Sequence, residues 1–213
     1  MIRVFIITLL SVFFISCSSE PLPYAWQAQA KLHLDKYQEM MLKGDFFQAK
    51  YYLQDAITEA KNDVTLETLA IVYLTQCAME KVMNQKSACT EYKNIKKLVN
   101  KPHFDAYADM LLNQAVTHIN LLGKYRSLYN SIKIKEVTLA DIKSFDTIYA
   151  QAIASMLVYN SGLINETISS YMIDKASLEN MKGLMLVWLN NAQTFMSGEK
   201  LERVKNQIKI LSD

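Results

Sequence analysis

The most constraining feature of this sequence is how few residues it contains that interrupt a helix. Its 213 residues include only 5 glycines and 3 prolines, well below the usual share of either residue. Apolar residues recur at steps of three or four along most of the chain. Few stretches alternate apolar and polar residues, which is the pattern of a half-buried strand. We therefore predict an all-α fold built from antiparallel helix pairs, either as a repeat array or as a compact helical domain.

The first twenty residues have the form of a secretory signal. Arg3 precedes an apolar run of twelve residues, Val4 to Ile15, which is too short to cross about 30 Å of hydrocarbon comfortably as a helix. Ser16 and Cys17 follow, and the sequence then becomes polar. This arrangement resembles the lipobox of bacterial lipoproteins, in which small residues precede the cysteine, although Phe14 replaces the usual leucine.

The lipobox resemblance implies an address and an anchor. Cys17 would become the first residue of the mature chain and would carry several acyl chains, which hold a protein on a bilayer far more firmly than one chain does. Because Ser18 and not aspartate follows the cysteine, the resemblance implies the outer membrane, with the protein facing the periplasm. We divide the chain into a signal peptide (1–16), a short tether (17–23) and a helical domain (24–213). The alternative is an ordinary cleaved signal or an uncleaved anchor with an incidental cysteine.

The helical domain is expected to consist of helices separated by short turns. Gly44 ends the first helix, and Asp45 is placed to cap the next one through its carboxylate. Thr138 and Asp141 form a capping-box pattern, and Ser177 is placed to cap a later helix. The expected helices are 24–43, 46–60, 65–82, 88–98, 104–122, 138–159, 177–195 and 199–211, with a short one through 128–132 and an irregular or helical piece over 165–174.

The stretch from Gly44 to Ala56 resembles the second half of a tetratricopeptide repeat. The matching positions are a turn glycine, the aromatic residue after it, and a large apolar residue between two small ones: Gly44, Phe46, Ala49, Leu53 and Ala56. Tyr37 departs from the family, which has a small residue at that place in the first helix. The resemblance implies paired helices whose first members line up on one concave face.

Such concave faces bind extended or helical protein segments. The candidate partner-binding residues on this face run from Trp26 through Tyr37 toward Tyr73. We expect a membrane-anchored scaffold or adaptor that binds another cell-envelope protein, for instance in assembling a secretion, pilus or motility apparatus. The alternative is a helical periplasmic domain with an internal pocket for a small or lipidic ligand.

The two remaining cysteines, Cys77 and Cys89, lie on either side of a predicted break between helices. On one continuous helix they would lie about 18 Å apart, which is too far for a disulfide. A chain reversal between them would bring them face to face, and an oxidising envelope compartment favours the bond. We predict a disulfide, and the alternative is two buried thiols.

Residues able to carry out chemistry are scattered along the chain. His33, His103 and His118 match no metal-ligand pattern, and His118 falls on an apolar stripe, which is typical of a core histidine. The sequence has no nucleophile motif or phosphate-binding glycine loop. Its 23 basic and 21 acidic residues give no case for binding nucleic acid. We expect no enzymatic activity, no cofactor and no metal site.

Overall fold

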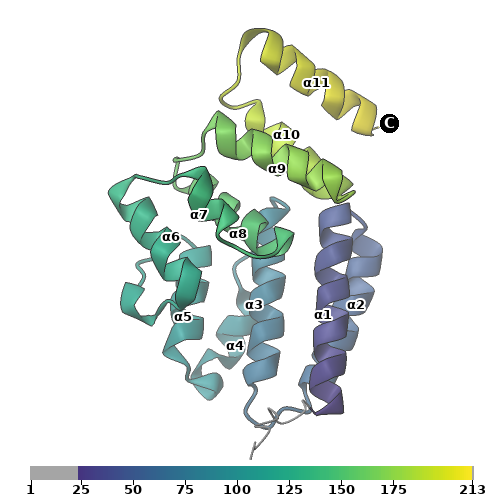
Figure 1. Cartoon of the computed structure of the whole chain (residues 1–213). Coiled ribbons are helices and arrows are strands. Elements are labelled where there is room, and N and C mark those ends of the chain that lie inside the picture. The colour runs from purple at the N-terminus through teal and green to yellow at the C-terminus, as the bar shows by residue number, and fades with distance from the viewer. Residues whose placement is uncertain (1–23, 213) are drawn as a thin grey trace, which may run out of the picture.

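The computed structural model of the protein describes residues 24–212, and every regular element in that part of the chain is a helix (Figure 1). This confirms the predicted all-α class and the packing of helices in pairs. The predicted signal peptide, the tether and Cys17 lie outside the described residues. None of the helices over 24–212 has both the length and the apolar character needed to cross a membrane.

Eleven α-helices and one short 3-10 helix make up the described chain. In order they are α1 (Ala25–Lys43), α2 (Phe46–Ala60), α3 (Glu67–Val82), α4 (Thr90–Val99), α5 (Pro102–Leu111), the 3-10 helix η1 (His118–Asn120), α6 (Gly123–Ile134), α7 (Leu139–Lys143), α8 (Ile148–Asn160), α9 (Glu166–Leu178), α10 (Lys182–Ala192) and α11 (Gly198–Ser212).

Helices α1 and α2 form the antiparallel pair that the sequence predicts. Gly44 takes a left-handed conformation (φ 86°) that suits glycine and ends α1. The Asp45 side chain then caps α2 by accepting a hydrogen bond of 3.0 Å from the backbone N–H of Gln48. Ala49 and Ala56 are buried, so small residues do lie where the two helices approach each other.

Helices α3 and α4 form a second pair, joined by the predicted disulfide. The chain reverses after α3, and the Cα atoms of Cys77 and Cys89 lie 5.1 Å apart in a Cys77–Cys89 disulfide. Both cysteines are buried. The predicted face-to-face placement of these two residues is therefore confirmed.

The helix predicted over 104–122 is wrong in its second half. α5 ends at Leu111, and Asn113 follows in a left-handed conformation (φ 54°) that a helix cannot continue through. The chain then loops to η1, where the Arg126 side chain donates hydrogen bonds to the carbonyl oxygens of Leu121 and Ile119. Because this loop lies on the surface, His118 is exposed, and its predicted place in the core is also wrong.

The helix predicted over 138–159 is divided into α7 and α8. Phe145 between them is buried in the core, and its carbonyl oxygen accepts a hydrogen bond of 2.8 Å from the side chain of Gln151. Thr147 then caps α8 by accepting from the backbone N–H of Ala150 at 3.2 Å. The break is therefore stabilised by the burial of Phe145, the Gln151 hydrogen bond and the local Thr147 cap, and the capping box at Thr138 is present as predicted.

The region predicted as an irregular or helical piece before a cap at Ser177 is the continuous helix α9. The Asn165 side chain caps it by accepting from the backbone N–H of Ile168 at 3.0 Å, and Ser177 lies inside the helix. α9 and α10 pack together above the end of α1 and α2 (Figure 1). α8 is the most buried helix, with a continuous buried run over 151–158.

Helix α3 organises the central part of the fold. It packs against α1 on one side, α5 on the other, and α8. Figure 1 shows α3 set between α1 and α5, with α7 and α8 across the upper end of that space. The first helices α1, α3 and α5 therefore lie next to one another, as a helical array predicts.

Candidate binding groove

A groove runs along the surface that α1, α3 and α5 share. It consists of two adjoining pockets with volumes of about 220 and about 490 Å³, which have Thr75, Tyr107 and Tyr125 in common. α3 forms its floor, α1 one side, and α5 with the chain around Leu122 the other. Residues of α8 line the end of the groove, so the groove is bounded there.

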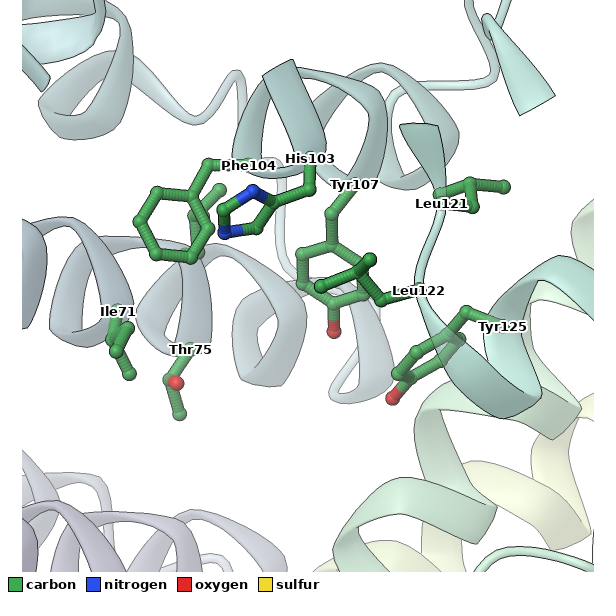
Figure 2. Close-up of a pocket in the computed structure, with 9 residues that line it drawn as sticks. Ile71, Thr75, His103, Phe104, Tyr107, Leu121, Leu122 and Tyr125 are labelled. Carbon is green, nitrogen blue, oxygen red and sulfur yellow. The ribbon is translucent and has the colours of Figure 1, made fainter. Parts of the chain in front are cut away.

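The smaller pocket is almost entirely apolar. Its lining comes from α3, from α5, and from the segment that leads from η1 into the first turn of α6: Ile71, Leu74, Thr75, His103, Phe104, Tyr107, Leu121, Leu122 and Tyr125. Figure 2 shows these side chains arranged around the opening between the helices. Leu122 is 59% exposed although it is a large apolar residue. An exposed apolar side chain at the edge of an apolar pocket is the arrangement expected of a contact surface.

Aromatic rings form one wall of the groove. The rings of Tyr107 and Tyr125 lie 5.0 Å apart between centroids, and those of Tyr125 and Phe145 lie 4.9 Å apart. Phe145 comes from the break between α7 and α8, so that break fixes the position of the wall. Figure 2 shows the hydroxyl groups of Tyr107 and Tyr125 pointing the same way, away from the helices that carry them.

The larger pocket is more polar. Lys31, Asp35 and Gln38 of α1 line one side, and Thr147 and Tyr149 line the end formed by α8. Lys31 and Asp35 form an exposed ion pair of 2.5 Å, so this side carries balanced charge. An ion pair this exposed contributes little to stability, and both groups remain available for contacts with a bound molecule.

The tyrosines of the groove are held in their neutral form. Burial raises the pKa of Tyr107 well above its ordinary value of 10, and the neighbouring Tyr125 adds to the effect. Burial also raises the pKa of Tyr149, with a further contribution from the negative charges of Glu39 and Asp35. The Tyr149 hydroxyl therefore stays protonated and able to donate a hydrogen bond to a carbonyl oxygen in the groove, whereas the Tyr107 hydroxyl is paired with that of Tyr125.

The three residues predicted to bind a partner do not line the groove. Tyr37 is only 2% exposed, and its hydroxyl donates to the carbonyl oxygen of Gln76 at 3.5 Å, so its predicted role as a surface contact is wrong. Tyr73 lines a separate polar pocket beside the disulfide. Trp26 is partly exposed near the start of α1, where it stacks on Tyr24. The groove instead takes its lining from other residues of α1 and α3 together with residues of α5, α6 and α8.

Some of the groove-lining residues that the prediction missed could have been found from the sequence, and others could not. Lys31, Asp35 and Gln38 follow one face of α1 at steps of four and three, so helical spacing could have found them. Leu122 could not be found in this way, because the sequence placed it at the end of a predicted helix that in fact stops at Leu111.

The histidines occupy three separate environments. His103 lines the groove, with its ring 4.3 Å from that of Phe104. His33 lies near Tyr52, and its Nδ1 is 3.8 Å from a carboxylate oxygen of Asp55. His118 is exposed. Within residues 24–212, no three His, Cys, Asp or Glu side chains come together in a way that could hold a metal ion.

Comparison with known proteins adds no relative to this description. No protein family, curated protein or solved structure is similar enough to the chain to count as a match.

Proposed function

We propose that the protein is a membrane-anchored adaptor that binds a segment of another cell-envelope protein in the groove between α1, α3 and α5. In this proposal Cys17 carries the lipid, the protein is held at the outer membrane, and the helical domain faces the periplasm. The observation that carries the proposal is the groove itself, since an apolar pocket adjoins a polar one along the first helices of the array.

The shape and chemistry of the groove favour a protein segment as its occupant. The apolar pocket can take one large apolar side chain, and the adjoining polar part offers tyrosine hydroxyls and an exposed ion pair to a backbone. A buried apolar anchor surrounded by polar contacts is the common arrangement in peptide recognition. We also infer that the helix pairs are tetratricopeptide-like, and the buried Ala49 and Ala56 between α1 and α2 support this.

An adaptor needs no reactive group to be useful. A lipid confines the protein to one surface, which raises the effective concentration of any protein bound to it there. This mechanism suits the assembly of a secretion, pilus or motility apparatus, because such structures are built from many copies at a membrane.

Site-specific photo-crosslinking tests the groove. A photoreactive amino acid replaces Leu122 at the edge of the groove, and in a matched control it replaces Ile134, which is equally exposed on α6 but outside the groove. We expect a discrete crosslinked protein from position 122 in intact cells and none from position 134. Equal crosslinking from both positions, or none from 122, contradicts the proposal.

A second candidate is a pocket for a small apolar or lipidic ligand. The apolar lining of the smaller pocket favours it. Its volume of about 220 Å³ and its open side count against it, since ligand sites usually enclose about 300–1,000 Å³. Mass spectrometry of the protein purified without added lipid distinguishes the two, because a stoichiometric bound lipid and no crosslinked partner would favour the ligand pocket.

Metabolic labelling tests the anchor separately. We expect the chain to take up a palmitate analogue and to fractionate with membranes, and we expect Cys17→Ala to lose both properties. A Cys17→Ala variant that still takes up the label and still fractionates with membranes would contradict the proposed anchor.

A further inference from the structure

One end of the helical body collects the start of α1, the end of α2, the start of α3, the end of α4 and the start of α5. We call this the proximal end, because the chain before Tyr24 joins the body here. Figure 1 shows these helix ends at the lower side of the molecule. The ion pair of 2.7 Å between Lys101 and Glu67 links two of the chain segments, and Val99 and Leu66 pack in the same small apolar cluster.

The proximal end exposes large apolar side chains. Val64 is 98% exposed, Leu98 72% and Tyr24 70%. Tyr24 stacks on the partly exposed Trp26, with ring centroids 6.1 Å apart and planes 5° from parallel. Exposing large apolar side chains to water is unfavourable. Tyrosine and tryptophan are enriched where a bilayer meets water, because their rings have an apolar body and a polar group.

Two lysines lie at the same helix ends, Lys61 at the end of α2 and Lys97 in the last turn of α4. Lys61 and Lys97 are exposed, and neither takes part in an ion pair within the described chain. The nearby carboxylate of Asp63 is occupied, because it accepts hydrogen bonds from the backbone and hydroxyl groups of Thr65 and Thr68. Free lysines beside exposed aromatic and aliphatic side chains match a lipid surface that carries negative headgroups.

The distance from the proposed lipid to this end is short. Only residues 18–23 separate Cys17 from Tyr24, so the two positions cannot lie more than about 25 Å apart. We infer that the proximal end rests on the bilayer itself, with Tyr24, Trp26, Val64 and Leu98 in the interfacial layer. This inference rests on the proposed lipid anchor and adds an orientation to it, with the first helices rising from the membrane.

The two tryptophans of the chain provide the test. Trp26 lies at the proximal end, whereas Trp188 is fully buried in α10. The full chain, processed and lipidated in cells, is purified and reconstituted into vesicles of phosphatidylcholine and phosphatidylglycerol whose acyl chains carry bromine, which quenches nearby tryptophan fluorescence. Trp188→Phe leaves Trp26 as the reporter, and Trp26→Phe leaves Trp188 as the matched control. If Trp188→Phe does not fold, the difference between the unaltered chain and Trp26→Phe gives the Trp26 signal.

We expect bromines near the headgroups to quench Trp26 more strongly than bromines deep in the bilayer, and we expect neither to quench Trp188. Lys61→Gln with Lys97→Gln should reduce binding of a Cys17→Ser chain to the same vesicles, by roughly fivefold for each lysine. If the lipidated chain floats with the vesicles but Trp26 is not quenched, the inference is overturned while the anchor stands. If the chain neither floats nor is quenched, both are overturned.

Discussion

A Cβ atom on Gly183 would lie 2.6 Å from the backbone nitrogen of Gly44, because the start of α10 meets the α1–α2 turn backbone to backbone. The same atom would lie 2.9 Å from the carbonyl oxygen of Leu42. No flexible side chain at this contact can move away to make room. The two glycines therefore join the first helix pair to the C-terminal part of the fold.

Replacing Gly183 with alanine should lower the free energy of unfolding by about 1–3 kcal/mol, as overpacking does in other cores. The loss should appear even though alanine favours a helix over glycine by roughly 1 kcal/mol. Denaturant titration followed by circular dichroism measures it. Lys182→Ala, at an exposed position next to it, is the control and should change stability by no more than about 0.5 kcal/mol. A Gly183→Ala variant as stable as this control would show that the contact is loose.

Reduction of the Cys77–Cys89 disulfide should lower the free energy of unfolding by roughly 2–4 kcal/mol, because the bond restricts the unfolded chain. The measurement is denaturant unfolding with and without a reductant. A chain that carries both Cys77→Ala and Cys89→Ala serves as the control and should not respond to the reductant. Free thiols at both positions in a digest of the non-reduced protein would contradict the prediction.

The capping carboxylate of Asp63 should make stability depend on pH in the acid range. Burial alone would raise its pKa, but hydrogen bonds from Thr68 and Thr65 outweigh burial and lower the pKa from 3.8 to about 2. The folded state thus binds this proton more weakly than the unfolded state. The stabilisation is therefore fully present above about pH 4 and is lost as the pH falls toward 2.

Asp63→Asn tests this dependence. The variant should lose less stability than the unaltered protein between pH 5 and pH 2.5, measured by denaturant unfolding at each pH. It should also be less stable at pH 7, by about 1 kcal/mol for a weakened cap. Asp174→Asn, which changes an exposed carboxylate on α9, should leave the acid dependence as it is. Parallel pH curves for Asp63→Asn and the unaltered protein would count against the role of this residue.

A charge placed at the edge of the groove should block partner binding without unfolding the protein. Leu122→Asp changes a residue that is 59% exposed, so the free energy of unfolding should move by no more than about 0.5 kcal/mol. A photoreactive amino acid in place of Ile71, which lines the same pocket, should crosslink the partner in the otherwise unaltered chain, and Leu122→Asp should abolish that crosslink. Ile134→Asp is the matched control and should retain the crosslink. Loss of the crosslink in both variants would indicate a general effect and not a groove contact.

The sequence was sufficient to predict the helices whose ends are marked by local signals. The turn between α1 and α2 is marked by two adjacent residues. Gly44 favours the left-handed conformation that ends α1, and the Asp45 side chain accepts a hydrogen bond from a free backbone N–H group at the start of α2. The paired cysteines could also be predicted, because a chain reversal between them was the only arrangement that allowed a bond.

The sequence was not sufficient where a helix ends for tertiary reasons. Around Phe145 the apolar spacing continues through the break, and the burial of that ring, the Gln151 side chain on its carbonyl oxygen and the Thr147 cap together explain it. For the same reason the sequence did not predict the aromatic wall of the groove, because the position of that wall depends on where the chain turns between Asn113 and Tyr125. Tyr37 shows the converse, because a large aromatic residue on the expected face is in fact part of the core.

The packing of α1 against α10 has a consequence for the order of folding. The α1–α2 pair can form early from local contacts, but the turn at its end is covered only after nearly the whole chain has been made. Contacts between segments so far apart in sequence form slowly, because a long loop must close first. During that interval the first helix pair exposes apolar surface. We therefore expect a chain cut short before Lys182 to aggregate or to be degraded while its first helices are already formed.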